Sequence, residues 1–164
     1  SSSLKELNFE QNTSIMNNFL SQSSDTKMFN RSDFKIVSKV KPSNEIFNNL
    51  LFTFNVCRFV KSNAIVISQN NTTIGIGSGQ PSRLDSCKIA VSKMRKFKRF
   101  DNKEKVVAAS DAFFPFVDGI ETLVQAGVEA IIQPSGSIRD KEIINFANKT
   151  NTILVFSKTR HFKH

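Results

Sequence analysis

The amino-acid sequence predicts an α/β domain, and three observations support this fold class. Apolar residues recur at helical spacing between residues 47 and 57. Two short β-prone runs, 64–67 and 72–76, flank a polar turn. From residue 105 onward, β-prone runs alternate with helical patterns. Such alternation is typical of a sheet covered by helices, with ligands bound at the loops that follow the carboxyl ends of the strands.

Length and composition are those of a soluble globular protein. The 164 residues suit one domain, with 39% hydrophobic and 23% charged residues. No apolar run approaches the roughly 20 residues that span a bilayer, and the N-terminus lacks both the apolar core of a secretory signal and an initiator Met. We therefore expect the chain to begin inside a longer one. Cys57 and Cys87 stand outside metal-binding motifs, so we expect neither zinc nor a disulfide framework and predict a cytoplasmic location.

The net charge of +9 leaves two interpretations open. A basic chain binds polyanions by releasing counterions from a phosphate backbone, and the densest basic patch runs from Lys93 to Arg99. The same patch lies at the end of a predicted helix, where cations complement the helix dipole. Nucleic-acid binding therefore stands beside a solvated surface or the attraction of small phosphorylated ligands.

The first half of the chain predicts a lead-in, a helix and a hairpin. Residues 1–32 are rich in Ser and Asn and weakly periodic, so we interpret them as a loosely ordered lead-in. The helix over 47–57 has Ser43 as its expected N-cap. The runs 64–67 and 72–76 are expected to pair as a hairpin.

The second half predicts strand–helix units. Ser82 and Asp85 form a capping-box pattern just before an apolar helical stripe. Ser137 and Asp140 repeat the pattern before another helix. The expected strands are 105–109, 128–132 and 153–156, and the expected helices begin near Ser82, Ile120 and Ser137.

Three loops follow predicted strands and open predicted helices: Gly77 to Gln80, Ser110 to Gly119, and Pro134 to Ser137. Backbone N–H groups at helix N-termini favour anions, and glycine lets a ligand approach closely. None of the loops matches a Walker loop or a dinucleotide fingerprint. In the second loop, three Phe and two Asp surround Pro115, which fixes a bend. These rings are candidates for a pocket wall, and the alternative is that they are core.

The tail from Arg160 to His164 follows the last predicted strand and holds both histidines of the chain. The fork of Arg160 suits a phosphate or carboxylate. A solvated basic end that frays is the alternative. His161 and His164 supply only two metal ligands, which is weak support for a metal site.

Five segments together resemble the C-terminal half of AICAR transformylase, the formyltransferase part of the bifunctional AICAR formyltransferase/IMP cyclohydrolase family. The segments are Lys61 to Val66, Gly75 to Ser86, Ser110 to Gly119, Gln133 to Asp140, and Arg160 to His164. They lie in unbroken order within a resemblance that runs from about Lys35 to His164, where the family's chain also ends. The resemblance implies a cytidine-deaminase-like subdomain over residues 33–164, a three-layer αβα fold with a mixed sheet.

The family transfers a formyl group from 10-formyltetrahydrofolate to the 5-amino group of AICAR in purine (IMP) biosynthesis. The resemblance implies catalytic roles for Asn63 and His164. The residues implied to bind AICAR are Phe113, Arg160 and Phe162. Those implied to line the folate pocket are Arg83, Leu84, Phe116, Asp118 and Ser137. A structural potassium ion is implied near Ser62 and Asp111.

Two departures and one missing motif qualify this resemblance. Val117 stands where the family usually has Arg, and Pro81 stands where Met or Gln is common. No segment matches the family's Lys-His pair, which supplies the principal proton transfer. General acid–base catalysis contributes about 10² to 10⁴ in rate, so the isolated chain is predicted to be nearly inactive. The family implies a homodimer and a need for the missing N-terminal half of the transformylase domain. The alternative function is a non-catalytic folate- or nucleotide-binding module, or a basic nucleic-acid-binding module.

Overall fold

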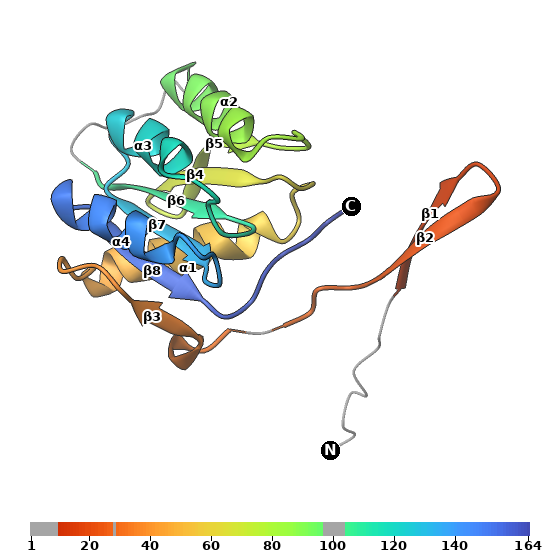
Figure 1. The fold of residues 1–164 in the computed structure, drawn as a ribbon, viewed down its shortest axis with the longest axis horizontal. Helices are drawn as coiled ribbons and strands as arrows, with labels where there is room; N and C mark the ends of the chain where they lie inside the picture. The colour runs from red at the N-terminus through yellow and green to blue at the C-terminus, as the bar shows by residue number, and fades with distance from the viewer. Residues whose placement is uncertain (1–9, 28, 97–103) are drawn as a thin grey trace.

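A six-stranded mixed sheet, in the order β3-β8-β7-β6-β4-β5, forms the centre of the molecule (Figure 1). This computed structural model describes residues 10–27, 29–96 and 104–164. The sheet strands are β3 (Phe34–Ile36), β4 (Ile65–Gln69), β5 (Thr72–Gly77), β6 (Val106–Ser110), β7 (Ala130–Pro134) and β8 (Ile153–Ser157). The helices are α1 (Asn44–Cys57), α2 (Arg83–Lys96), α3 (Val117–Gln125) and α4 (Asp140–Lys149), with a short 3-10 turn at Arg31–Asp33.

The strand directions bring several loops to one edge of the sheet. Strands β6, β7 and β8 are parallel, whereas β4 runs antiparallel to both β6 and β5. Strand β5 therefore points the same way as β6. The carboxyl ends of β5, β6, β7 and β8 and the amino end of β4 consequently share one edge.

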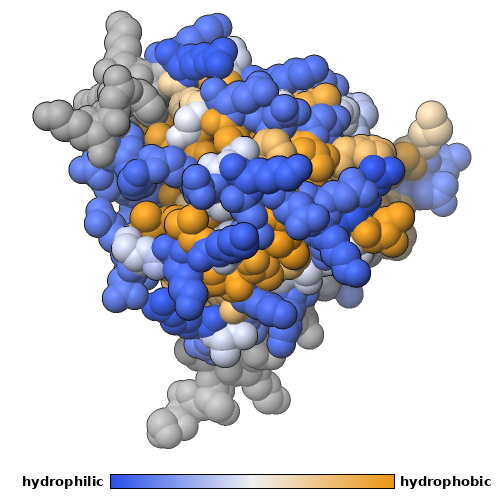
Figure 2. Space-filling model, turned by 60° about the vertical axis from the view of Figure 1, so that its left-hand side comes forward, coloured by the Kyte–Doolittle hydropathy of each residue, from blue (hydrophilic) through white to orange (hydrophobic). Residues whose placement is uncertain are grey.

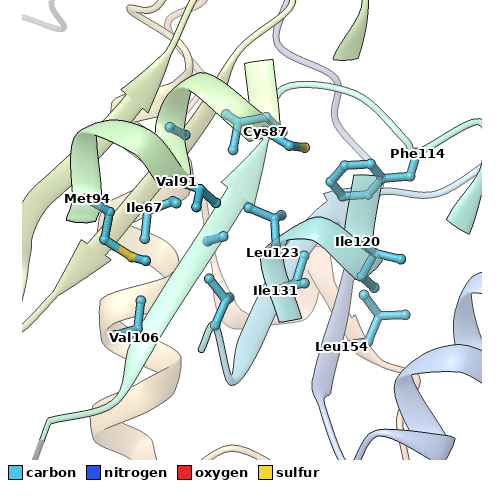
Figure 3. Close-up of a cluster of buried hydrophobic side chains, with 14 of the residues drawn as sticks. Ile67, Cys87, Val91, Met94, Val106, Phe114, Ile120, Leu123, Ile131 and Leu154 are labelled. Carbon is cyan, nitrogen blue, oxygen red and sulfur yellow. The ribbon is translucent and has the colours of Figure 1, made fainter. Parts of the chain in front are cut away.

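Helices cover both faces of the sheet, which confirms the expected three-layer α/β architecture. Side chains alternate between the faces of a strand, so Ile65 and Ile67 join one core while Val66 joins the other. Phe54 of α1 packs in the core that contains Val66. Helices α2, α3 and α4 cover the opposite face. Figure 3 shows the core on that side, where α2 and α3 contribute Cys87, Val91, Met94, Ile120 and Leu123.

Most of the predicted elements are confirmed within two residues. The Oγ of Ser43 accepts a hydrogen bond from the backbone N of Ile46 (3.2 Å), as expected of the N-cap of α1. The hydroxyl of Ser82 accepts from the backbone N of Asp85 (3.4 Å) at the start of α2.

The predicted start of the last helix at Ser137 is wrong. Helix α4 begins at Asp140, and its N-cap position is Arg139, which makes no side-chain cap. The reason is that Asp140 folds back to accept hydrogen bonds from the backbone N–H groups of Gly136 and Ser137. These bonds hold a turn and leave the helix to start after it.

The two glycines of strand β5 allow close packing of a helix. A Cβ at Gly77 would lie 1.9 Å from the backbone O of Ser86, and one at Gly75 would lie 2.3 Å from that of Ala90. Helix α2 therefore lies directly on the backbone of β5, at a distance that only glycine permits. This packing accounts for Gly75 and Gly77 without a ligand.

The predicted lead-in contains a hairpin that its weak periodicity did not indicate. Strands β1 (Glu10–Ile15) and β2 (Asn18–Ser23) pair as a separate two-stranded sheet. Its tip projects away from the six-stranded sheet (Figure 1), with Met16 and Phe19 exposed. The domain boundary at residue 33 stays a prediction.

Hydrophilic side chains cover most of the face in Figure 2, with hydrophobic groups visible between them. Within the described ranges, no helix combines the length and the apolar character that crossing a bilayer requires.

Candidate functional site

A pocket of about 490 Å³ opens at the edge of the sheet where the strand ends meet. Four segments build it: the approach to β4, the start of α2, the loop from β6 to α3, and the tail after β8. The lining residues are Asn63, Pro81, Ser82, Arg83, Leu84, Ala112, Phe113, Phe114, Pro115, Phe116, Asp118, Gly119, Arg160 and Phe162. Eight of the residues singled out in the sequence lie together here: Asn63, Arg83, Leu84, Phe113, Phe116, Asp118, Arg160 and Phe162.

The side-chain amide of Asn63 is held on both sides. Its Nδ2 donates to the backbone O of Gln80 (2.9 Å) and of Pro81 (3.0 Å). Its Oδ1 accepts from Nη2 of Arg83 (2.8 Å). The peptide bond between Ser62 and Asn63 is cis. These contacts fix the plane of the amide at the pocket wall.

Arg83 forms an ion pair with Asp111 beneath the pocket. Its Nη1 donates to a carboxylate oxygen of Asp111 and to the Oγ of Ser110 (2.9 Å). The Asp111 side chain is fully buried and that of Arg83 is 10% exposed. Because the same guanidinium holds Asn63, this network joins the start of α2 to the end of β6. The ion pair of Arg83 with Asp111 was not predicted, because the two residues are 28 positions apart in the chain.

The surroundings of Ser62 and Asp111 are already hydrogen-bonded. One carboxylate oxygen of Asp111 faces Arg83, and the other accepts from the Oγ of Ser62 (2.6 Å). A cation beside this carboxylate would share it with the guanidinium and would have to displace or extend these contacts. These two side chains alone therefore fit potassium poorly, and the ion near them stays a prediction. Within the described ranges, no three His, Cys, Asp or Glu side chains group together as metal ligands.

Phenylalanine rings form the outer wall of the pocket. Phe114 is buried in the core, whereas Phe116 is 51% exposed and Phe162 is 40% exposed. The guanidinium of Arg160 lies 4.7 Å from the centre of the Phe113 ring, and that of Arg139 lies 4.8 Å from the centre of Phe116. Each distance is within the range of a cation–π contact. Arg139 was not predicted as a site residue, because it is 23 positions from Phe116 and belongs to no recognisable motif.

Two of the residues predicted to bind substrates or to act in catalysis, Ser137 and His164, do not line the pocket. The Oγ of Ser137 accepts from the backbone N of Arg139 (3.2 Å) in the turn before α4. The ring of His164 stacks on Phe162, with 5.8 Å between their centres. His164 thus supports the pocket wall from outside, and Val117, which departs from the family pattern, packs against the core.

His161 lies buried in the tail between two pocket residues. Its Nδ1 contacts the carboxylate of Asp25, and its ring lies 4.3 Å from that of Phe54, centre to centre. Burial lowers the pKa of His161 below its usual value, and the hydrogen bond that the ring donates to Asp25 opposes this shift without overcoming it. The imidazole is therefore neutral at pH 7, with Nδ1–H donating to Asp25.

Both cysteines are free and buried. Burial raises the pKa of Cys87 to about 12 and that of Cys57 well above its usual value. Neither thiol is ionised at neutral pH, so neither is a nucleophile for the pocket.

The basic patch lies partly within the described residues. Lys93, Arg95 and Lys96 stand in the last turn of α2, where they complement the helix dipole. The remainder of the predicted patch, 97–99, lies outside the described residues.

Comparisons with known proteins identify similar chains. A family model described as "AICARFT/IMPCHase bienzyme" matches residues 2–93. The bifunctional purine biosynthesis protein PurH of Buchnera aphidicola subsp. Schizaphis graminum is 46% identical over 160 residues, covering 98% of this chain and 30% of the relative. PurH of Bartonella bacilliformis is 48% identical over 150 residues, covering 88% of this chain and 28% of the relative. The chain therefore spans about three tenths of the length of these curated relatives. Among solved structures, the dCMP deaminase of cyanophage S-TIM5 aligns with a TM-score of 0.44 at 16% identity, covering 69% of this chain and 98% of that one.

Proposed function

Because the chain belongs to the AICARFT/IMPCHase bienzyme family of purine biosynthesis, we propose that it supplies the C-terminal half of a formyl-transfer site for AICAR. The observation that carries the proposal is the pocket at the sheet edge. Eight side chains that the resemblance assigns to AICAR, folate or catalysis, spread from Asn63 to Phe162, line this single cavity.

The chemistry of the lining suits a nucleotide beside a folate. Arg160 is an exposed cation of the tail that lines the pocket, and its fork matches the oxygens of a phosphate. Phe113, Phe116 and Phe162 offer ring faces to the flat AICAR base and to a pterin. 10-Formyltetrahydrofolate would supply the formyl group as cosubstrate. The AICAR amine is a weak nucleophile, so holding the two reactants in register is a large part of the catalytic task.

Asn63 is the residue of this chain that we place nearest the reacting groups. Its fixed amide presents a polar edge at the wall between the α2 side and the tail side of the pocket. His164 acts one step removed, through the ring of Phe162 on which it stacks.

We further propose that catalysis needs a partner. The principal proton transfer of the family is assigned to a Lys-His pair for which this chain has no match, so turnover requires the preceding half of the transformylase domain. A homodimer in the cytoplasm is the expected setting.

Ligand titration tests the proposal. Isothermal titration with AICAR, alone and with a folate analogue, should show saturable binding to the chain. Arg160→Ala should weaken AICAR binding about 10-fold to 100-fold, since a charge-assisted hydrogen bond contributes about 1.5–3 kcal/mol. Lys158→Ala is the matched control, because Lys158 is an exposed cation in the same tail that does not line the pocket. Equal effects of the two substitutions would contradict the assignment.

Turnover provides a second test. The chain alone should give essentially no formyl transfer, and mixing it with the preceding half should restore activity that Asn63→Ala abolishes. Robust turnover by the chain alone would refute the need for the missing pair.

The basic end of α2 favours one competing function, nucleic-acid binding. Oligonucleotide affinity that falls steeply with salt, and falls further in a Lys93→Ala/Lys96→Ala variant, would support this alternative. Weak binding that is indifferent to both substitutions would count against it.

A further inference from the structure

The tail that carries Arg160 and Phe162 into the pocket belongs to no helix or strand, yet it is held on two sides. On the body side, the bonds join mainly backbone groups, with one serine hydroxyl and the Nζ of Lys163, which donates to the backbone O of Phe59 (3.2 Å). The backbone N of His161 donates to the backbone O of Asp111 (2.9 Å), and that of Ser62 donates to the backbone O of Lys163 (2.9 Å). The backbone N of Lys163 donates to the Oγ of Ser62 (3.3 Å).

On the other side, a segment more than 130 positions earlier holds the tail with side chains. Residues 22–27, which we term the strap, comprise the end of β2 and the segment that follows it. Gln22 donates to the backbone O of Phe162 and accepts from the backbone N of His164. Lys27 donates from Nζ to the Oγ1 of Thr159 (2.7 Å).

The strap makes its most buried contact with the tail between Asp25 and His161. The His161 side chain is 1% exposed, and its ring packs against the rings of Phe29 and Phe54. Its Nε2 is buried without a hydrogen-bond partner, so Asp25 makes the ring's side-chain hydrogen bond. A histidine with both ring nitrogens unpaired is costly to keep buried. Loss of Asp25 would therefore remove the side-chain hydrogen bond that orients the His161 ring and would leave the tail with its bonds on the body side.

Phe162 is the wall through which the strap reaches the pocket. Its ring lines the pocket and also a second cavity of about 320 Å³ formed with the strap, where Gln22, Asp25 and Arg58 contribute. A shift of the strap therefore moves a side chain that faces the pocket directly.

We infer that Asp25 is a positioning residue for the pocket: through His161, the strap sets the places of Arg160 and Phe162. The strap touches none of the other pocket-lining residues in the contacts described, so its effect passes through the tail. The identity of the ligand that senses this effect rests on the proposed function, whereas the positioning itself does not.

Amide hydrogen exchange tests the positioning without any ligand. Asp25→Leu should speed exchange at the amides of Ser62, His161 and Lys163 at least tenfold, while amides in β7 keep wild-type rates. Asp25→Asn retains an oxygen that accepts from Nδ1–H and should restore protection. Thr26→Ala, an exposed change in the same segment, is the control. Unchanged exchange in Asp25→Leu, or no rescue by Asp25→Asn, would overturn the inference.

A second variant covers the case in which Asp25→Leu does not fold. Gln22→Leu removes the two strap contacts at Phe162 and His164 and leaves Asp25 in place. It should speed amide exchange at Lys163 and Ser62. Wild-type exchange rates at these amides would equally contradict the inference that the strap positions the tail.

AICAR affinity separates this inference from the proposed function. At a temperature where both proteins are fully folded, Asp25→Leu should weaken AICAR binding about tenfold relative to Asp25→Asn. A merely structural role would lower the thermal midpoint and leave this affinity unchanged, which would contradict the inference. Absence of AICAR binding to the wild-type chain would instead refute AICAR as the ligand. The hydrogen-exchange measurement would then decide whether the strap positions the tail.

Discussion

Arg83 connects three parts of the chain through one guanidinium. It reaches Asn63 before β4, Ser110 at the end of β6, and Asp111 directly after that strand. A buried ion pair of this kind contributes little net stability, but removal of one partner leaves the other charge buried without a counter-charge. The pair therefore fixes geometry at the pocket floor more than it adds free energy.

A double-mutant cycle measures this coupling. Asp111→Ala should lower the free energy of unfolding by about 3–5 kcal/mol, because Arg83 is left buried without a counter-charge. Urea unfolding followed by circular dichroism gives the values. The double variant Arg83→Met/Asp111→Ala should cost clearly less than the sum of the single substitutions. Strict additivity would show that the pair does not act as a unit.

The two thiols should be silent in the folded protein. Because burial raises the pKa of Cys57 and Cys87, both remain protonated and inaccessible at pH 8. A thiol-reactive dye should label neither residue in buffer and both in denaturant. Fast labelling of the native protein would contradict the burial of these side chains.

At the scale of the elements, the helix starts show which sequence signals are reliable. Ser43 and Ser137 both precede an apolar helical pattern, but only Ser43 caps its helix. The difference lies in Asp140, whose carboxylate binds the loop N–H groups that a serine cap would have left free. The Oγ of Ser137 accepts from the backbone N of Arg139 in this turn, an arrangement that the local sequence pattern does not reveal.

Paired substitutions test the distinction. Ser43→Ala should cost about 1 kcal/mol of stability through loss of the cap on α1. Ser137→Ala should cost less than about 0.5 kcal/mol, the range of ordinary surface changes. Urea unfolding of both variants supplies the comparison, and a larger loss at Ser137 would reverse the assignment.

The strands and helices were predictable because burial periodicity is a local property. The alternating cores of Ile65, Val66 and Ile67 follow directly from their order in the chain. The hairpin of β1 and β2 was not predictable, since its polar composition carries no periodic apolar signal. The packing role of Gly77 was not predicted, because the helix backbone that it contacts, at Ser86, comes nine positions later in the chain.

At the scale of the whole molecule, the topology gathers the candidate site. Insertion of β4 antiparallel between β5 and β6 places Asn63 at the same edge as the loop after β6 and the tail after β8. The sequence indicated most of these residues through resemblance, but not their shared network. The contacts of Arg83 with Asp111, Arg139 with Phe116, and Asp25 with His161 join distant positions that only the fold brings together.

The pH dependence of global stability should carry the signature of His161. Burial lowers its pKa in the folded state below the unfolded value of 6.5. The hydrogen bond donated to Asp25 and the charge of Asp111 raise this pKa, and the charge of Arg58 lowers it, but burial has the largest effect. The unfolded chain therefore binds more protons, and the free energy of unfolding falls as pH drops through 6.5 toward the folded pKa. The slope from this group is at most about 1.4 kcal/mol per pH unit.

Urea unfolding at pH 7.5 and 5.5 measures the effect. The wild-type chain should lose more stability over this interval than His161→Phe, which keeps a ring packed against Phe29 and Phe54 but does not titrate. Equal losses in the two proteins would rule out His161 as the source.

The tail bound on both sides has a practical consequence for handling the protein. The backbone N of His164 already bonds to Gln22, and its ring already stacks on a pocket wall. Extra residues fused after this position would start within the contacts that shape the pocket. Affinity tags and fluorescent fusions should therefore be attached at the opposite terminus, and binding data from C-terminally tagged protein should be compared with the tag-free chain.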